Sequence, residues 1–209
     1  MPTVIENLEK FNRKERFFLV GKALGNPKFI LDPSFRKALE SKFKLTIPAD
    51  AFVAMDYHLN WIYAACALAF EQPYKDRIYN NVDRIVDGTQ EDVDLIVAYQ
   101  DRSGVYNLIM LEAKGVTYFS NGQFIHKVGR LKHIFRDDGK RWPQVAPYFG
   151  LVSPKESKRL KYEICPSWLK IEGKIPWFEM EITPARLAVY GCNIQGKRDK
   201  NRNYWSVRE

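Results

Sequence analysis

Apolar positions in the middle of the chain form two short runs separated by a polar turn. The runs are Val93–Tyr99 and Val105–Ala113, and the turn between them is Gln100–Gly104. Short apolar runs rich in β-branched residues, joined by a turn that contains Ser-Gly, predict the two strands of a β-hairpin. A third strand is predicted over 77–86, ahead of the hairpin.

Helical spacing predicts helices on both sides of these strands. The longest apolar stripe lies within 51–71 and consists of Phe52, Met55, Leu59, Ile62, Cys66 and Ala69. A helix from Ser120 to about Arg136 has a predicted buried side made of Phe124, Val128, Leu131 and Phe135. Shorter helices are predicted over 5–20 and from Asp32 to about Phe43. In the latter, Asp is a good N-cap and the following Pro suits the first helical position.

Further strands are predicted at 144–152, 177–182, 187–190 and 204–207. The order helix, three strands, helix, strand predicts an α/β fold with a central mixed β-sheet flanked by helices. We expect residues 1–47 to form an N-terminal helical extension packed on the core, and residues 48–209 to form the main domain. Its core covers about 50–153, and residues 154–209 supply additional C-terminal strands.

Composition is that of one well-buried domain: 209 residues, 45% of them hydrophobic. The longest apolar stretch, 64–70, is far too short to span a bilayer, and the first residues contain acids with no apolar core after them. We therefore expect no membrane association and no signal peptide. Cys66, Cys165 and Cys192 are widely spaced and form no CxxC pair, which argues against a disulfide framework and a structural zinc. A cytoplasmic protein is expected.

Charge is unevenly distributed along the chain. The formal net charge is +8, but residues 51–112 carry four Lys/Arg against ten Asp/Glu. The net charge of this middle part is therefore −6, and that of the two flanks together is +14. A basic surround attracts a polyanion and an acidic pocket holds a cation, which is the combination that a metal-dependent nuclease needs.

Two carboxylates are predicted to meet at one end of the hairpin. Side chains alternate along a strand, so in an antiparallel pair Asp94 and Glu112 can approach each other, while Lys114 shares the face of Glu112. Two carboxylates at so short a distance repel each other unless a cation neutralises them. Mg²⁺, with Mn²⁺ as a substitute, prefers such oxygens, and the carbonyl of Ala113 is a further candidate ligand. Lys114 would then hold or activate the attacking water and stabilise charge on a phosphate.

The Glu-x-Lys tripeptide alone carries no information, because it occurs four times, at 40–42, 112–114, 156–158 and 172–174. Three features distinguish the copy at 112–114. It ends an apolar strand, an aspartate-led apolar strand precedes it by one hairpin, and a basic helix follows it.

Asp94 followed by Glu112-Ala113-Lys114 resembles the PD-(D/E)XK nuclease superfamily, which has the restriction-endonuclease-like fold. The resemblance covers about residues 50–153. It implies an Mg²⁺-dependent endonuclease that hydrolyses phosphodiester bonds of DNA, with Asp94 and Glu112 as metal ligands and Lys114 assisting the attacking water. The P in the superfamily name denotes a proline directly before the first aspartate, and this chain has Val93 at that position.

Two positions in this resemblance have alternative interpretations. Asp92 shares the strand parity of Asp94 and is the other candidate ligand; Asp94 is preferred because the apolar run begins directly after it. In some branches of the superfamily a glutamine on the helix after the lysine contributes to the site, and Gln123 matches it by position. Ser120 and Gln123 also have the spacing of a capping box, which explains both residues locally.

Basic side chains beside the predicted site are candidates for contacts with the phosphate backbone. They are Lys127 and Arg130 on the helix, and Lys197, Arg198, Lys200 and Arg202 in the loop 195–203. Such residues position the nucleic acid and do not read its sequence. Asp56 is an additional candidate acid near a metal, whereas His58 is interpreted as structural.

The rival hypothesis is a non-catalytic nucleic-acid-binding protein that uses the same fold and the same basic flanks. A purely structural protein would leave the acidic middle and the basic ends unexplained. DNA is the expected partner, and the sequence leaves open duplex, single-stranded and branched forms as well as RNA. Because one site cuts one strand, a homodimer is expected if the protein cuts both strands of a duplex.

Overall fold

The hairpin predicted in the middle of the chain is present in the computed structural model. β2 (Asp92–Gln100) and β3 (Tyr106–Ala113) pair in antiparallel fashion, with Val97 opposite Ile109. Asp101 holds the turn between them, because its carboxylate accepts hydrogen bonds from the backbone N–H groups of Ser103 (2.9 Å) and Val105 (3.1 Å).

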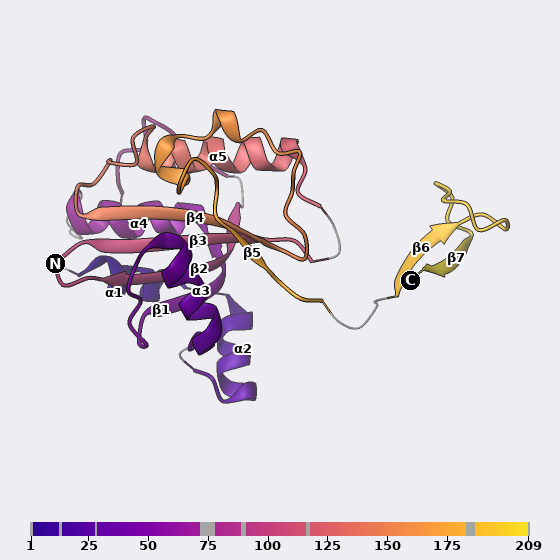
Figure 1. Cartoon of the computed structure of the whole chain (residues 1–209), viewed down its shortest axis with the longest axis horizontal. Coiled ribbons are helices and arrows are strands. Elements are labelled where there is room, and N and C mark those ends of the chain that lie inside the picture. The colour runs from indigo at the N-terminus through magenta and orange to yellow at the C-terminus, as the bar shows by residue number, and fades with distance from the viewer. Residues whose placement is uncertain are drawn as a thin grey trace. The chain divides into compact units, whose positions relative to one another are not determined.

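The structure describes residues 2–12, 14–27, 29–71, 78–88, 91–115, 118–182 and 187–208. They divide into a large unit, residues 1–179, and a small C-terminal unit, residues 180–209 (Figure 1). The predicted division at residue 48 stays a prediction.

The large unit is built around a five-stranded sheet with the order β1-β2-β3-β4-β5. β1 (Phe52–His58) is antiparallel to β2, whereas β4 (Val145–Ser153) is parallel to β3 and β5 (Trp177–Glu179) is parallel to β4. The α/β class with a mixed central sheet flanked by helices is therefore confirmed.

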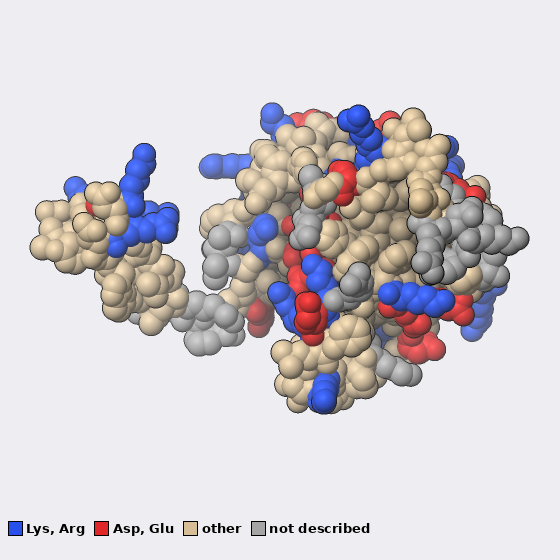
Figure 2. All heavy atoms as spheres, turned by 180° about the vertical axis from the view of Figure 1, so that it is seen from behind, with Lys and Arg blue, Asp and Glu red and all other residues tan. Residues whose placement is uncertain are grey.

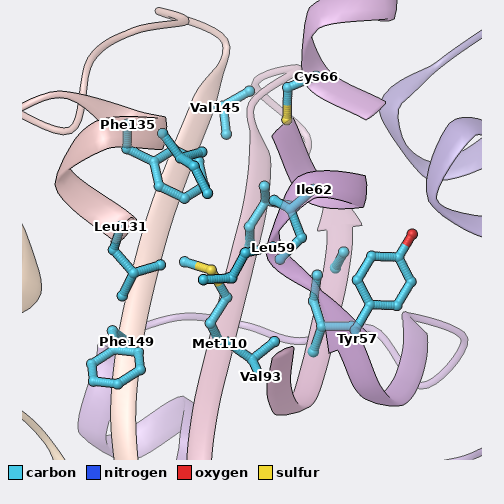
Figure 3. Close-up of a cluster of buried hydrophobic side chains, with 14 of the residues drawn as sticks. Tyr57, Leu59, Ile62, Cys66, Val93, Met110, Leu131, Phe135, Val145 and Phe149 are labelled. Atoms are coloured by element: carbon cyan, nitrogen blue, oxygen red, sulfur yellow. The ribbon is translucent and has the colours of Figure 1, made fainter. Parts of the chain in front are cut away.

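One face of the sheet is covered by α4 (Leu59–Phe70) and α5 (Asn121–Phe135), and α1 (Val4–Phe11) packs on α4. Figure 3 shows the core between the sheet and the helices α4 and α5, where Val93 and Met110 of the sheet lie among side chains of these helices. The predicted buried side of α5 is confirmed, since Phe124, Val128, Leu131 and Phe135 are all buried.

The other face is covered by α3 (Pro33–Phe43), capped by Asp32 as predicted. The ring of Phe43 lies 5.6 Å from those of Tyr148 and Phe178, measured between centroids. Gly150 makes this packing possible, because a Cβ there would stand 2.9 Å from side-chain carbons of Leu111 and Phe178.

The helix predicted over 51–71 is wrong in its first third. Residues 52–58 form β1, and the helix begins only at Leu59. The apolar spacing from Phe52 to Leu59 fits both a strand and a helix, and the unpaired edge of β2 decides for the strand. Asp56 has the left-handed backbone angle φ +49° in the middle of β1, and the described pairing with β2 omits it.

Two further predictions need correction. The strand over 77–86 is absent from the described part of this segment, residues 78–86, which consists of turns and irregular backbone; residue 77 lies outside the described residues. The single helix over 5–20 is two helices, α1 and α2 (Glu15–Leu24), because the chain leaves helical geometry at Asn12, which has φ −69° and ψ 95°.

The C-terminal strands are present but are divided between the two units. β5 extends the central sheet, whereas β6 (Ala188–Cys192) and β7 (Tyr204–Arg208) form a separate two-stranded antiparallel sheet. Two short 3-10 helices, Tyr162–Ile164 and Ser167–Leu169, lie between β4 and β5. Among the described residues, no helix is both long and apolar enough to cross a bilayer.

Candidate active site

Asp94 and Glu112 are brought together by the register of the hairpin. Leu95 pairs with Leu111, so continuing the register by one residue puts Asp94 opposite Glu112. Cross-strand partners share a face of the sheet, with Cβ atoms about 5 Å apart. The carboxylate of Asp94 also accepts a hydrogen bond of 2.6 Å from the backbone N–H of Ala113, which holds it against the end of β3.

Two lysines approach Glu112 from different elements. Lys114 follows Glu112 by two residues, so both side chains point to the same side of the chain. Its Nζ lies 3.8 Å from Glu112 Oε1. Lys127 Nζ on α5 lies 3.2 Å from Glu112 Oε2, and the Lys127 side chain is only 9% exposed. Burial raises the pKa of the Glu112 carboxyl, and the neighbouring Asp94 charge raises it further; Lys127 opposes both effects. Burial thus disfavours the charged form of Glu112, and the neighbouring lysines favour it.

Asp92 is held by partners of its own. Lys14 Nζ lies 2.8 Å from Asp92 Oδ2, and His58 Nε2 lies 3.4 Å from Asp92 Oδ1. Asp94 faces Glu112 across the hairpin. This arrangement favours Asp94 over Asp92 as the second ligand beside Glu112.

Asp56 is drawn into an ion pair with Arg16 of α2. The regular register of β1 and β2 would put Asp56 opposite Asp94, and this is the pair that the left-handed backbone at Asp56 interrupts. The predicted role of Asp56 as an extra acid near a metal stays a prediction.

A cavity of about 390 Å³ lies between the end of β3 and the first turns of α5. Glu112, Lys114, Gln123 and Lys127 all line it, so four predicted site residues from two elements face one space. Gln123 is exposed there, and its backbone N–H donates to the Ser120 hydroxyl at 3.4 Å. The cap therefore forms, and the Gln123 side chain also faces the cavity.

The sequence interpretation missed two residues of this cavity, Glu91 and His126. His126 Nδ1 lies 3.3 Å from the Glu91 carboxylate, and Lys127 Nζ lies 3.6 Å from Glu91 Oε1. A signal for both existed, since Glu91 begins the acidic run that contains Asp94, and His126 is three residues after Gln123 on the same helix.

Lys127 and Arg130 are both buried, with 7% of each residue exposed. Lys127 donates a hydrogen bond to the carbonyl of Asp92 in addition to its ion pairs. Arg130 donates to Asn60 Oδ1 at 2.6 Å and to the carbonyl of Ile85 at 2.7 Å. These two cations thus connect α5 to the segments before β2, and their contact with phosphate stays a prediction.

The remaining predicted basic residues lie in the small unit, in the turns between β6 and β7. Lys197, Arg198, Lys200 and Arg202 are all exposed there. The guanidinium of Arg198 lies 5.8 Å from the ring centroid of Tyr190.

The donor set suits a hard divalent cation that retains several waters. Among the described residues, no three His, Cys, Asp or Glu side chains gather as a ready cluster of metal ligands. Glu112 Oε2 and Glu91 Oε2 are buried atoms without a hydrogen bond of good geometry, and each lies beside one basic side chain, Lys127 at 3.2 Å and His126 at 3.3 Å. The N–H and C=O of one strand residue point to the same neighbouring strand, so the Ala113 carbonyl points toward β2, as its N–H does. Asp94, Glu112 and this carbonyl fit Mg²⁺, which commonly uses one or two carboxylates.

Comparison with protein-family models, curated proteins and solved structures gives no match for this chain. The resemblance to PD-(D/E)XK nucleases therefore stays a prediction from the sequence.

Proposed function

We propose that the protein is a metal-dependent endonuclease that hydrolyses phosphodiester bonds of DNA. One observation carries the proposal: Asp94 and Glu112 are opposite each other at the end of a central hairpin, with Lys114 3.8 Å from Glu112. The cavity is lined by Glu112, Lys114 and Gln123 but not by Asp94, so the proposal puts the substrate on the Glu112 side of the carboxylate pair.

In this proposal, Asp94, Glu112 and the Ala113 carbonyl hold Mg²⁺ or Mn²⁺. The bound ion would lower the pKa of a coordinated water and neutralise charge on the phosphate. The 2.6 Å hydrogen bond from Ala113 N–H fixes the carboxylate of Asp94, so this ligand is positioned before any cation arrives.

Lys114 supplies the mobile positive charge of the site. Its side chain is 24% exposed, whereas that of Lys127 is 9% exposed and has three partners. Lys114 lines the cavity and would donate there to the attacking water and stabilise a phosphate oxygen as negative charge develops. Lys127 opposes the rise that burial causes in the pKa of Glu112, and Gln123 would orient the water or the phosphate.

The test is cleavage of supercoiled plasmid and of labelled oligonucleotides with Mg²⁺ or Mn²⁺, and with a chelator instead. We expect metal-dependent nicking or cutting. Lys114→Ala and Asp94→Asn should each reduce the rate at least about a hundredfold, as removal of a transition-state contact typically does.

Lys158→Ala is the matched control, because Lys158 is exposed and ends another Glu-x-Lys tripeptide, 156–158. It should cut at the wild-type rate. Thermal unfolding of all three variants checks that the chain remains folded. Equal cleavage by folded Lys114→Ala and wild-type protein would contradict the assignment.

One observation favours a second candidate, a non-catalytic nucleic-acid-binding protein. Lys127 Nζ already places a fixed cation 3.2 Å from Glu112, so this carboxylate is neutralised without a metal. Salt-dependent DNA binding that Mg²⁺ does not alter, with no cleavage of any substrate form, would support this candidate.

A further inference from the structure

The small C-terminal unit leaves an apolar face of a two-stranded sheet uncovered. Val189 pairs with Val207 and Gly191 pairs with Trp205, so these four residues share one face. The exposed fractions are 69% for Val189, 71% for Trp205 and 43% for Val207. An isolated two-stranded hairpin is marginally stable in water, so a face of this kind gains from a partner.

Arg202 lies on the same face, directly over Gly191. A Cβ at Gly191 would stand 2.5 Å from Arg202 Cγ and 2.7 Å from Arg202 Cβ. The missing side chain thus lets the aliphatic stem of Arg202 lie against the strand, beside the cross-strand partner of Gly191, which is Trp205. A guanidinium and an indole are therefore neighbours on an open surface.

The charge of this unit restricts the chemistry of a partner. Residues 187–208 contain five Lys or Arg and a single acid, Asp199. Basic side chains dominate the charged surface of this unit in Figure 2, whereas acidic and basic side chains are mixed on the visible face of the large unit. A net charge of +4 on 22 residues favours a polyanion over a second copy of the same hairpin, which would bring like charges together.

We propose that this face binds an unpaired strand of DNA, with a base stacked on Trp205 and phosphates contacted by Arg202 and Lys200. Indole rings are effective stacking platforms because every base has a π-face, and adjacent cations follow the backbone. In a duplex the bases are stacked on each other within the helix, so no base face is free to stack on Trp205. The inference rests on the proposed nuclease function, because it names the form of DNA that the enzyme would hold.

The experiment measures binding of the full-length chain to a fluorescein-labelled 20-nucleotide oligo-dT by anisotropy, without divalent cations. The duplex of the same length and oligo-U are the comparison probes. Trp205→Ala should weaken binding of oligo-dT about fivefold or more, the loss expected for one stacked base, and Trp205→Phe should retain most of it. Arg202→Gln should lower the slope of log affinity against log salt by about 0.7, the value for one phosphate of a single strand.

Two matched variants separate this surface from general effects. Tyr204→Ala removes an aromatic side chain from the opposite face of β7, and Lys37→Gln removes a charge from α3. Both should bind oligo-dT with at most a twofold change. Far-UV circular dichroism and size-exclusion chromatography of each variant check folding and oligomeric state.

Unchanged oligo-dT binding by Trp205→Ala, or an equal loss with Tyr204→Ala, would overturn the proposal. Tighter binding of the duplex or of oligo-U, or a Trp205→Ala effect confined to oligomeric state, would also overturn it. The cleavage assay is independent of this result, since Mg²⁺-dependent cutting by wild-type protein, combined with unchanged oligo-dT binding by Trp205→Ala, refutes only the hairpin surface. Strand binding through Trp205 without any cleavage refutes only the nuclease.

Discussion

Lys127 is a buried cation shared by two acids. Its Nζ lies 3.2 Å from Glu112 and 3.6 Å from Glu91, and it donates to the Asp92 carbonyl. Removing one partner of a buried ion pair leaves the other charge without compensation, which costs more than the pair contributes. Lys127 therefore stabilises the fold and at the same time favours the charged form of the proposed metal ligand Glu112.

Lys127→Met should lower the free energy of unfolding by about 2–4 kcal/mol, because two carboxylates lose their buried cation. Urea denaturation at pH 7 without divalent cations measures the effect. Lys132→Met is the matched control on the same helix, since Lys132 pairs with Asp137 on the surface. It should cost about 0.5 kcal/mol or less.

Adding Glu112→Gln to Lys127→Met should recover part of the loss, because the neutral amide no longer needs a cation. Equal destabilisation by Lys127→Met and Lys132→Met would show that the buried cluster has no special energetic weight.

The hairpin turn depends on one carboxylate. Besides its two backbone contacts, Asp101 accepts from the Ser103 hydroxyl at 2.6 Å and from the Asn107 amide at 3.1 Å. The hydroxyl of Ser103, followed by the amide of Asn107, lowers the pKa of Asp101 below its ordinary value of 3.8. The charged form is thus favoured in the folded state.

A lowered carboxyl pKa contributes stability above its unfolded value and loses it as the pH falls through the folded value. Wild-type protein should therefore be more stable than Asp101→Asn at pH 7, and the difference should decrease below pH 4. Denaturant unfolding at several pH values between 3 and 7 measures this. A difference that does not change with pH would mean that the charge of Asp101 does not hold the turn.

The elements that the sequence predicts correctly are those with local signals. The hairpin follows from two apolar runs and a turn, and α3 and α5 follow from caps and a single helical stripe. The sequence predicts a helix where β1 forms, because Phe52, Met55 and Leu59 fit helical spacing. Only pairing with β2, which is distant in sequence, decides against the helix, and no local pattern contains that information.

The same distinction applies to the site residues. Strand alternation has a period of two, so the approach of Asp94 and Glu112 could be predicted from parity alone. The burial of Lys127 and Arg130 could not, because a helix sequence does not show which acids and carbonyls pack against its polar face. Glu91 and His126 did have local signals, the acidic run and the helical spacing from Gln123, but the sequence does not show that the two side chains meet.

At the scale of the whole molecule, the large unit contains its own core. Each member of the main buried cluster, from Val4 to Ile175, lies within residues 1–179. The small unit contributes none of these residues. The chain thus combines a complete folded unit with a small basic hairpin.

A chain ending at Glu179 should unfold cooperatively, with a midpoint within about 5 °C of the full-length protein, because its core is intact. Differential scanning calorimetry of both chains measures this. The shortened chain should keep Mg²⁺-dependent cleavage of plasmid and lose affinity for oligo-dT. A broad, non-cooperative transition would show that residues 180–209 are required for the fold.

The five-residue connection between β2 and β3 also orders the steps by which the chain folds. A hairpin closed by so short a segment forms within about 1–10 μs, whereas the parallel pairing of β3 with β4 must wait for the crossover through α5. We therefore expect Asp94 and Glu112 to come together while both are still hydrated, and Lys127 to arrive later with its helix. The desolvation of the two acids is postponed to the step that also delivers their counter-charge.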